Sequence, residues 1–358
     1  MKVRRKEARR WGSCLLSLMC TLVLVGGLFG CAPGNQQEAQ PESQAVQDKG
    51  AQSEGSSDAK DDQSAGQQGE QSAKKDGAQT PSAPVDEALL QSWEADFKRL
   101  ADESGMEVEV CAIDLASGGT VAHRSDQKIL SASMIKLLIG EAFLGQVSEG
   151  KQALDDTYVL KEGDIVGGTG SLGARGAGAS VTKRELVQKM IAESDNVATN
   201  VLIDLCGMDA VNAEAKRLGL KCTELGRHMM DTEAAANGYD NYTCADDIAV
   251  LLKMVYDKTY VNEEMSAFML ECLEAQIDND CISTGLPAGT VFAHKTGSLA
   301  TVRHDGGIVE GEKPFVIVTL CGGEGFNEQG AQGIMGQIGE AAYRDMYGKE
   351  GTSLSAVA

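Results

Sequence analysis

The sequence predicts an α+β fold, in which one antiparallel five-stranded sheet is built from both chain ends of the folded region around an inserted all-helical block. Alternating apolar residues predict two early strands, at 108–112 and 120–122. Three later segments, 290–293, 307–310 and 315–320, have the same character. Between these two groups the apolar residues recur at helical spacing, and a helix flanks the strands at each end. This order is typical of helices segregated to the faces of an antiparallel sheet.

The composition excludes two broad classes of protein. The chain has 358 residues, with 32 Lys and Arg against 53 Asp and Glu, and a formal net charge of −21. Because this negative charge repels polyanions, we expect no nucleic-acid partner. The ten cysteines are too few and too scattered for a small disulfide-framework protein.

Residues 1–31 are predicted to be a lipoprotein signal peptide. A basic segment is followed by an apolar run over 15–29, which is shorter than the roughly 20 residues of a membrane-spanning helix. The run ends Leu28-Phe29-Gly30-Cys31, which resembles the lipobox of bacterial lipoproteins. This resemblance implies that Cys31 carries a lipid and anchors an exported protein to the extracytoplasmic face of the cell membrane. A cleaved signal with an incidental cysteine is the alternative.

Residues 32–84 are predicted to be a disordered, low-complexity tether. They contain one branched aliphatic residue, Val46, and no aromatic residue. Such a segment cannot bury enough apolar surface to offset its chain entropy. Residues 85–350 are predicted to form one folded domain, and 351–358 are predicted to be a disordered tail.

Each helix of this domain has its own signal. The first ends at Gly105 and the second contains the apolar run after Lys136, while Thr182–Glu185 is a capping box that begins another. Further apolar stripes predict helices at 197–206, 210–218, 245–256, 263–275 and 331–347.

Ser133 and Lys136 form an S-x-x-K motif at the start of an apolar helix. Residues three apart share one helix face, so the amine can reach the hydroxyl. The pattern occurs six times in this chain and is weak on its own. Only this copy opens an apolar helix, where partial burial would lower the pKa of Lys136 toward that of a base. A helix-capping serine beside a lysine with a buried stem is the purely structural alternative.

Two further motifs strengthen this interpretation. Ser194-Asp195-Asn196 lies between two predicted helices, and Lys295-Thr296-Gly297-Ser298 lies on a late strand. In this order, S-x-x-K, S-D-N and K-T-G resemble the signature set of class A β-lactamases and penicillin-binding proteins. The chain is therefore identified as a class A β-lactamase-like serine hydrolase, and the resemblance extends from about residue 85 to residue 347. It implies the β-lactamase/transpeptidase-like fold.

The resemblance also implies a role for each motif residue. Ser133 would be the acylated nucleophile, Lys136 its base or proton relay, and Ser194 the proton donor to the leaving nitrogen. Substrate binding would fall to Asn196, which also steadies Lys136, and to the segment Lys295, Thr296, Gly297 and Ser298, which anchors the substrate carboxylate. The backbone N–H groups of Ser133 and Ser298 would form the oxyanion hole.

One position departs from the family pattern. In the hydrolytic enzymes, a glutamate two residues after an arginine activates the water that releases the acyl group. Here Arg227 is followed at that position by Met229, which cannot accept a proton, so deacylation is expected to be impaired. Asp231 or Glu233 would substitute in a loop of different register, and the alternative is that both are solvated acids.

Three functions follow, in order of preference. The first is a serine β-lactamase that opens β-lactam rings through a Ser133 acyl-enzyme, and so contributes to antibiotic resistance. The second is a penicillin-binding D,D-carboxypeptidase or esterase acting on cell-wall peptides, and the third is a non-catalytic cell-wall binding or sensing module. The expected partners are a β-lactam or a D-Ala-D-Ala-like peptide, and the membrane through Cys31. We expect a monomer.

Other motifs point to no cofactor or metal. Gly168–Gly173 satisfies G-x-G-x-x-G, but more glycine follows it and the next helix begins only after Thr182, so it is predicted to be a rim loop. The four histidines lack metal-ligand spacing. Arg303 and His304 are expected either to add positive charge near the carboxylate pocket or to lie at the surface.

Overall fold

The computed structural model describes residues 83–348. The predicted signal peptide with Cys31, nearly all of the predicted tether and the tail 351–358 therefore lie outside the described residues. Within 83–348, each helix is too short or too polar to cross a membrane.

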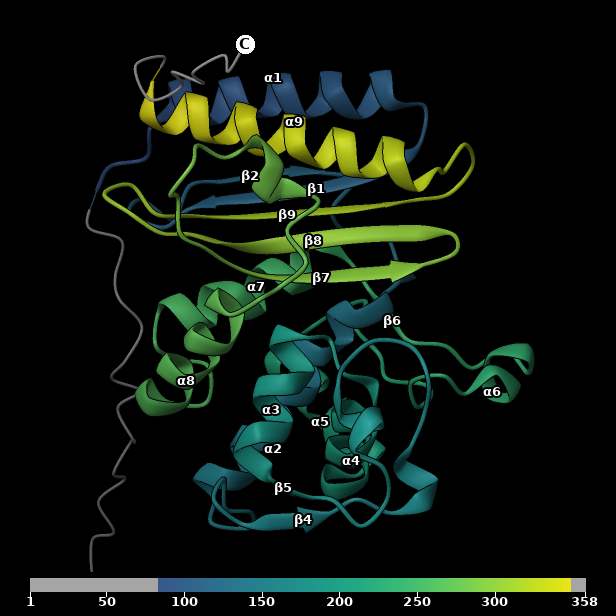
Figure 1. The fold of residues 1–358 in the computed structure, drawn as a ribbon. Coiled ribbons are helices and arrows are strands. Elements are labelled where there is room, and N and C mark those ends of the chain that lie inside the picture. The colour runs from purple at the N-terminus through teal and green to yellow at the C-terminus, as the bar shows by residue number, and fades with distance from the viewer. Residues whose placement is uncertain (1–82, 349–358) are drawn as a thin grey trace, which may run out of the picture. The chain divides into compact units, whose positions relative to one another are not determined.

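A five-stranded antiparallel sheet is the centre of the fold (Figure 1), as predicted. Its strand order is β2-β1-β9-β8-β7, so the two early strands and the three late strands join into one sheet where β1 pairs with β9. β1 lies between β2 and β9, and Val108 of β1 is opposite Cys321 of β9. The strands are β1 (Glu107–Asp114), β2 (Thr120–His123), β7 (Phe292–Leu299), β8 (Val302–Val309) and β9 (Phe315–Gly322).

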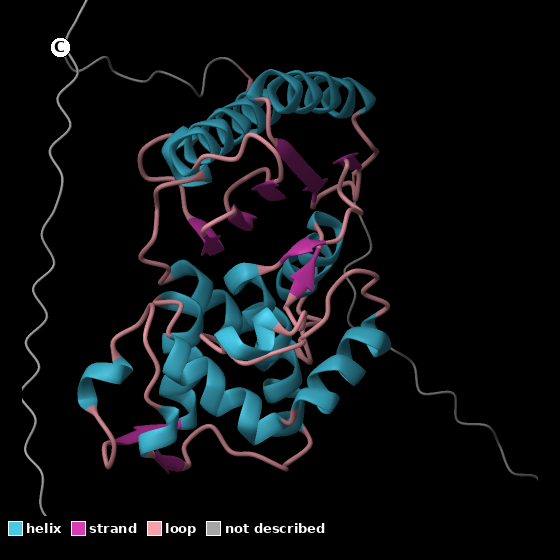
Figure 2. Cartoon of the chain, turned by 90° about the vertical axis from the view of Figure 1, so that its right-hand side faces the viewer, coloured by secondary structure: helices cyan, strands magenta, loops and turns pink. Residues whose placement is uncertain are grey.

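Two helices cover one face of the sheet (Figures 1 and 2). These are α1 (Glu87–Ser104) and α9 (Glu328–Tyr347). The helix α1 ends at Gly105, whose φ of 69° is left-handed and suits a residue without a Cβ atom. Trp93 of α1 is fully buried and its indole Nε1 donates to Ala342 O at 3.1 Å, which fixes the two helices against each other.

The opposite face carries the helical block (Figure 2). Its central helix α2 (Lys136–Ser148) is buried along most of its length, because it is apolar on every side. The predicted capping residue Thr182 accepts a hydrogen bond from Glu185 N at 3.1 Å and begins α3. The remaining helices begin or end within two residues of their predicted bounds: α3 (Lys183–Ala192), α4 (Asn196–Cys206), α5 (Met208–Leu218), α7 (Ala245–Tyr256) and α8 (Glu263–Glu274).

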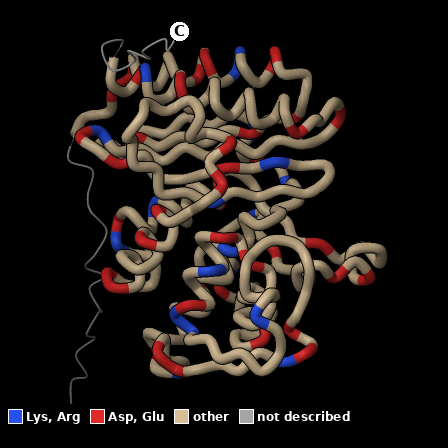
Figure 3. Tube along the Cα trace, in the orientation of Figure 1, with Lys and Arg blue, Asp and Glu red and all other residues tan. Residues whose placement is uncertain are grey.

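Several short elements have no counterpart in the sequence prediction. They are the strand pair β3 (Ile129–Leu130) and β6 (Tyr242–Thr243), the pair β4 (Thr157–Val159) and β5 (Ser180–Thr182), and helix α6 (Thr232–Ala236). Strands of two or three residues are too short to show an alternating pattern. Lys and Arg positions are interspersed with Asp and Glu along the described chain and form no continuous basic stripe there (Figure 3).

Candidate active site

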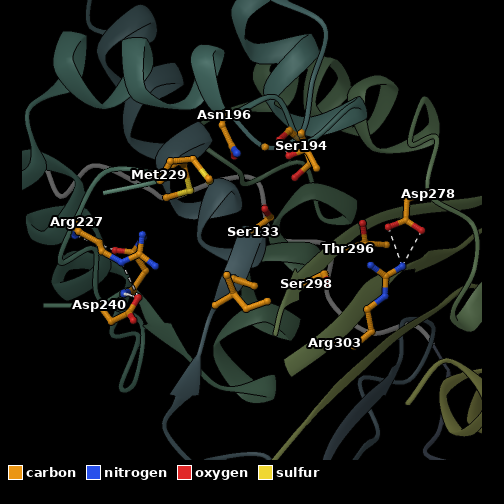
Figure 4. Close-up of a pocket in the computed structure, with 16 residues that line it drawn as sticks. Ser133, Ser194, Asn196, Arg227, Met229, Asp240, Asp278, Thr296, Ser298 and Arg303 are labelled. Carbon is orange, nitrogen blue, oxygen red and sulfur yellow. Dashed lines mark hydrogen bonds and ion pairs between the residues drawn. The ribbon is translucent and has the colours of Figure 1, made fainter. Parts of the chain in front are cut away.

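A cavity of about 210 Å³ lies at the seam between strand β7 and the helical block. Five of the residues that the sequence singles out line it together (Figure 4): Ser133, Ser194, Asn196, Thr296 and Ser298. They come from three separate stretches of the chain, which the fold brings to one place.

Ser133 lies in a 3-10 turn, Ala132–Ile135, and α2 begins only at Lys136. The expectation that the serine opens the α-helix itself is therefore wrong by one turn. Ala132 has φ 45°, a left-handed conformation that is unfavourable for a residue with a Cβ atom. Met134 and Ile135 are fully buried, and their packing holds the turn while Ser133 remains partly exposed to the cavity.

Gly297 brings β7 against this serine turn. A Cβ atom on Gly297 would lie 3.2 Å from both Ala132 Cβ and Ser133 N, and 3.3 Å from Met134 Cγ. These distances are shorter than ordinary van der Waals contact, so the last position of K-T-G needs a residue without a side chain. The close approach sets the strand directly beside the serine.

Lys136 is fully buried beneath the serine. Its Nζ donates hydrogen bonds to Ser194 O at 2.6 Å, to Ser194 Oγ at 3.0 Å and to Asn196 Oδ1 at 3.0 Å. Burial, and secondarily the charge of Lys295, lower the pKa of Lys136 well below its usual value. The lowered pKa favours the neutral amine, which can accept a proton.

Lys295 is the second fully buried lysine of the site. Its Nζ donates to Ser194 Oγ at 3.1 Å and to Thr296 O at 2.7 Å. Burial lowers the pKa of Lys295 to about 7, against the opposing influence of the Asp278 and Asp305 carboxylates. The ammonium form thus coexists with the amine near neutral pH.

Ser194 connects the two lysines, because its hydroxyl oxygen accepts from both Nζ atoms. It adopts φ 54°, a left-handed conformation that costs energy and that turns its carbonyl oxygen toward Lys136. Thr169 Oγ1 donates to the same carbonyl at 2.6 Å. With its acceptor capacity filled by two amines, the Ser194 hydroxyl has its own proton free to donate.

The S-D-N segment is tied to the glycine-rich rim. Asp195 caps α4 by accepting from Ala198 N at 2.9 Å, and it also accepts from Leu172 N at 2.8 Å. Asn196 Nδ2 donates to Gly167 O at 3.2 Å. Gly168 has φ 89°, and a Cβ atom there would lie 2.3 Å from Asn196 Nδ2. The predicted rim loop is therefore confirmed, and its glycines permit this close approach.

An ion pair between the buried Arg303 and the half-buried Asp278 forms another part of the cavity wall. Arg303 Nη2 donates to both carboxylate oxygens of Asp278 at 2.8 Å, and both residues line the cavity (Figure 4). No sequence pattern marked Asp278. The expectation for His304 is wrong: it is fully buried, burial lowers its pKa to about 4, and its ring nitrogen Nε2 lies 2.7 Å from Leu130 O. It is neutral near pH 7 and adds no positive charge.

The remaining wall is the loop between α5 and β6. Arg227 Nε donates to Asp240 Oδ1 at 2.9 Å across its neck (Figure 4). Met229 is 8% exposed and lines the cavity. Its backbone is fixed by Asn200, whose Oδ1 accepts from Met229 N at 2.8 Å and whose Nδ2 donates to Met229 O at 3.0 Å.

The two acids considered as substitutes for the missing glutamate lie elsewhere on this loop. Asp231 accepts from Ala234 N at 2.9 Å and so caps the short helix α6. It lines a neighbouring hollow with Met229 and Asp204, but not the cavity that holds Ser133. Glu233 is exposed on α6 and does not line the cavity.

Comparison with known proteins agrees with this geometry. Residues 92–346 match the model of the beta-lactamase enzyme family. Beta-lactamase AST-1 of Nocardia asteroides is 30% identical over 229 residues, which cover 62% of this chain and 73% of that protein. A β-lactamase structure from Sphaerobacter thermophilus is 28% identical, with a TM-score of 0.64 over 73% of this chain and 98% of that chain.

A second structural neighbour is a variant of PBP-A, described as an acyl-enzyme complex with penicillin G. It has a TM-score of 0.66 at 23% identity and covers 74% of this chain and 98% of its own. At this identity it supports the fold alone. Since the family model spans most of the chain, and the three motifs converge on one cavity, the chain belongs to the beta-lactamase enzyme family.

Proposed function

We propose that the protein opens β-lactam rings through an acyl-enzyme on Ser133 and releases the acyl group slowly. Membership of its family makes the chain a β-lactamase-type hydrolase in the broad sense. The observation that carries the finer proposal is the placement of Ser194 Oγ between the Nζ atoms of Lys136 and Lys295. It joins both amines in one proton-conducting cluster at the wall of the serine's cavity.

Acylation would begin with attack of Ser133 Oγ on the carbonyl carbon of the lactam. The hydroxyl proton passes to the neutral amine of Lys136, whose lowered pKa makes it a competent base. The carbonyl oxygen becomes an oxyanion, for which the backbone N–H groups of Ser133 and Ser298 are the proposed donors. The packing of Gly297 against Ser133 N sets the strand and the turn at the short separation that two converging donors require.

Ring opening would then need a proton on the departing nitrogen. As the C–N bond breaks, Ser194 donates its hydroxyl proton to that nitrogen and regains one from Lys136 or Lys295, which both hydrogen-bond to it. Lys136 returns to its neutral form when it supplies this proton. The products of the half-reaction are an ester on Ser133 and a secondary amine on the ligand, so that atoms and charge balance.

Substrate anchoring would use the β7 side of the cavity. β-Lactams carry a carboxylate, for which the hydroxyl groups of Thr296 and Ser298, which line the cavity, are two donors. The Lys295 ammonium, buried behind them, would supply the positive charge. Asn196 would hold the ligand's amide side chain, because its Oδ1 already accepts from Lys136 and its position at the start of α4 is fixed.

Deacylation is the slow step of the proposed reaction. The position that carries the glutamate in the hydrolytic enzymes is Met229, which lines the cavity and whose thioether cannot take a proton from water. Asp231 and Glu233 do not line the cavity. The one carboxylate of the loop that does line the cavity, Asp240, is paired with Arg227 and is therefore a poor proton acceptor. A water that attacks the ester would mainly have to give its proton to the lysine cluster, and release would be slow.

This same feature favours one further function. A persistent acyl-enzyme is what a penicillin-binding D,D-carboxypeptidase or esterase forms with a penicillin, while its own cell-wall peptide or ester substrate turns over. The intact set of Ser133, Lys136, Ser194 and Lys295 disfavours a non-catalytic binding module.

One experiment distinguishes these functions. The purified protein is mixed with a chromogenic cephalosporin, the absorbance is followed, and the intact mass is then measured. Many turnovers support a β-lactamase, a single burst with a lasting covalent adduct supports a penicillin-binding enzyme, and the absence of both overturns the proposal. The Ser133→Ala variant should lose adduct and turnover, whereas Ser92→Ala, a matched change on the exposed side of α1, should lose neither.

We also propose that the protein is exported and anchored by a lipid on Cys31. The basic start of the chain, its apolar run and the segment Leu28–Cys31 support this proposal. Fractionation of cells that express the full chain tests it. Wild-type protein and a Cys20→Ser control should sediment with membranes, and Cys31→Ser should not; equal sedimentation of all three would contradict it.

A further inference from the structure

Two cysteines meet at the base of the loop that carries Met229. Cys222 follows α5 and Cys244 immediately precedes α7, so the two residues flank the loop in sequence. Their sulfur atoms lie within 4.8 Å of each other and of an oxygen of the Asp247 carboxylate. The other cysteine pair that is close in sequence, Cys272 and Cys281, is divided between two separate apolar clusters of the core.

The register of the backbone explains why the two sulfurs meet. Glu224 and Tyr242 form an antiparallel bridge, with Glu224 N donating to Tyr242 O at 3.1 Å and Tyr242 N to Glu224 O at 3.0 Å. One residue further along, the hydroxyl oxygens of Thr223 and Thr243 are 2.9 Å apart. The next step in this register sets Cys222 opposite Cys244.

This cross-strand position suits a covalent bond between the sulfurs. The backbone ladder does not continue to this pair, because Cys222 N donates to Asp247 Oδ2 at 2.7 Å. Opposite residues of antiparallel strands have Cα atoms about 4.5–5.5 Å apart, which is within the range of about 4.4–6.8 Å found in disulfides. Since the two sulfur atoms already lie within 4.8 Å of each other, the pair is within reach of a disulfide bond.

Asp247 does not behave as a free metal ligand in this cluster. Its Oδ1 accepts from Lys221 N at 2.9 Å. Its Oδ2 accepts from Cys222 N at 2.7 Å, and from Thr223 N and Thr223 Oγ1 at 2.8 Å. Both oxygens are thus committed to donors of the preceding strand, and only two sulfurs remain, fewer than the four ligands of a structural zinc site.

We propose that Cys222 and Cys244 are a redox-active pair whose oxidation to a disulfide closes the loop between them and fixes the wall of the active-site cavity. Cys222 is partly exposed, so an oxidant can reach it, whereas Cys244 is fully buried behind it. The bond would enclose Arg227, Met229 and Asp240, which all line the cavity. This inference is independent of whether the protein opens β-lactams.

The oxidant would be a small disulfide. The Cys222 thiolate attacks one of its sulfurs and releases one thiol, which leaves a mixed disulfide on Cys222. The Cys244 thiolate then attacks the sulfur of Cys222 and releases the second thiol. The protein pair loses two protons and two electrons, and the small disulfide is reduced to two thiols. Burial raises the pKa of both cysteine thiols, so the reaction is expected to be faster at alkaline pH.

The test uses the full chain incubated with oxidised glutathione at mildly alkaline pH, followed by alkylation and non-reducing peptide mapping. We expect one cross-linked peptide pair containing Cys222 and Cys244, two hydrogen masses below the reduced peptides. The thermal midpoint should rise by about 5 °C on oxidation and fall again with dithiothreitol. Cys222→Ser and Cys244→Ser should lose both effects, and Cys206→Ser, which removes another partly exposed thiol, should keep them.

Other results would overturn the proposal. Cys222 recovered alkylated, or held as an unresolved mixed disulfide with glutathione, would show that Cys244 cannot complete the exchange. A reduced protein that binds Zn²⁺ or Cu⁺ through the pair, and is then protected from oxidation, would make this a metal site instead. Because the wild-type protein is compared with itself in oxidised and reduced form, failure of a variant to fold does not affect the outcome.

Discussion

The two sides of the active-site cavity differ in their capacity to move protons. On one side, Lys136, Ser194 and Lys295 form a continuous hydrogen-bonded cluster. On the loop side, Met229 presents a thioether, and its neighbour Arg227 is committed to the Asp240 carboxylate across the loop neck. The comparison teaches that the groups for forming an acyl-enzyme are complete, whereas a dedicated base for releasing it is missing from the loop.

The proton-carrying side is also the energetically expensive one. Both lysines are fully buried, and within residues 83–348 neither Nζ atom forms an ion pair with a carboxylate. Burying a lysine ammonium without a carboxylate partner costs free energy. Burial therefore lowers the pKa of each lysine and favours the neutral amine. Such clusters are characteristic of functional sites.

Removal of the Lys136 amine should have the largest effect. Lys136→Met keeps the length and apolar packing of the side chain but removes the base, so acylation by penicillin G should slow by about 10³- to 10⁴-fold. The rate of adduct formation is measured by quenched intact-mass spectrometry, with circular dichroism to verify folding. Lys98→Met, on the exposed side of α1, is the control and should acylate at the wild-type rate. A Lys136→Met rate within tenfold of wild type would break the comparison.

Placing a carboxylate at position 229 should supply the base for deacylation that the loop side of the cavity lacks. Met229→Glu places a proton acceptor in the cavity, so loss of the acyl adduct should accelerate by about 10²- to 10³-fold while acylation changes little. The adduct lifetime is measured by mass spectrometry after removal of free penicillin.

Two further variants serve as controls for the Met229→Glu result. Asp231→Asn and Glu233→Gln should leave the wild-type lifetime unchanged, because neither side chain lines the cavity. A shortened lifetime in Met229→Glu and a lengthened one in Asp231→Asn would instead show that the loop already supplies its own base.

Disturbing the contact between β7 and the serine turn should have a smaller but measurable effect on the acylation rate. Gly297→Ala adds a methyl group 3.2 Å from Ser133 N, which must displace the turn or the strand. A displacement of this size should slow acylation by about 10- to 100-fold without affecting the adduct lifetime. The same mass assay measures both, and Gly333→Ala on α9, where a Cβ atom meets nothing within 4 Å, is the matched control. Equal rates for the two variants would contradict the proposed role of the close approach.

The dependence of kcat/KM on pH should reflect the titration of both Lys136 and Lys295. As pH rises, Lys136 loses its proton and becomes a base, so kcat/KM for a chromogenic cephalosporin rises. Above the pKa of Lys295, about 7, the ammonium that anchors the substrate carboxylate is lost, and kcat/KM falls by about tenfold per pH unit. An ester substrate without a carboxylate should keep the rising limb and lose the falling one. Retention of both limbs would assign the fall to another group.

The sequence predicts the sheet and the main helices because their signals are local. Thr182 and Gly105 mark helix ends through their own backbone chemistry, and the late strands are long enough to show their apolar character. The one-turn error at Ser133 has a tertiary cause: the packing of β7 against Ala132 holds the turn in a form that helical periodicity does not encode.

The motif residues of the site could be selected from sequence, but their partners could not. Asp278 pairs with Arg303, and Cys222 meets Cys244, through contacts between distant segments that carry no pattern of their own. His304 shows the opposite failure. It was expected either to add positive charge near the carboxylate pocket or to lie at the surface, but every residue of β8 is buried, and its ring is therefore buried and neutral.

The position of β1 between β2 and β9 has a consequence for how the protein must be made. One edge of β1 finds its partner within the adjacent hairpin, but the other must wait for Phe315–Gly322, near the end of the described chain. During synthesis the ribosome has already released the first helix and strand long before this partner emerges. Closing so long a segment is entropically costly and slow. The sheet therefore cannot be completed until the last strand of the domain is available, so the two halves of the folded region must assemble together rather than one after the other.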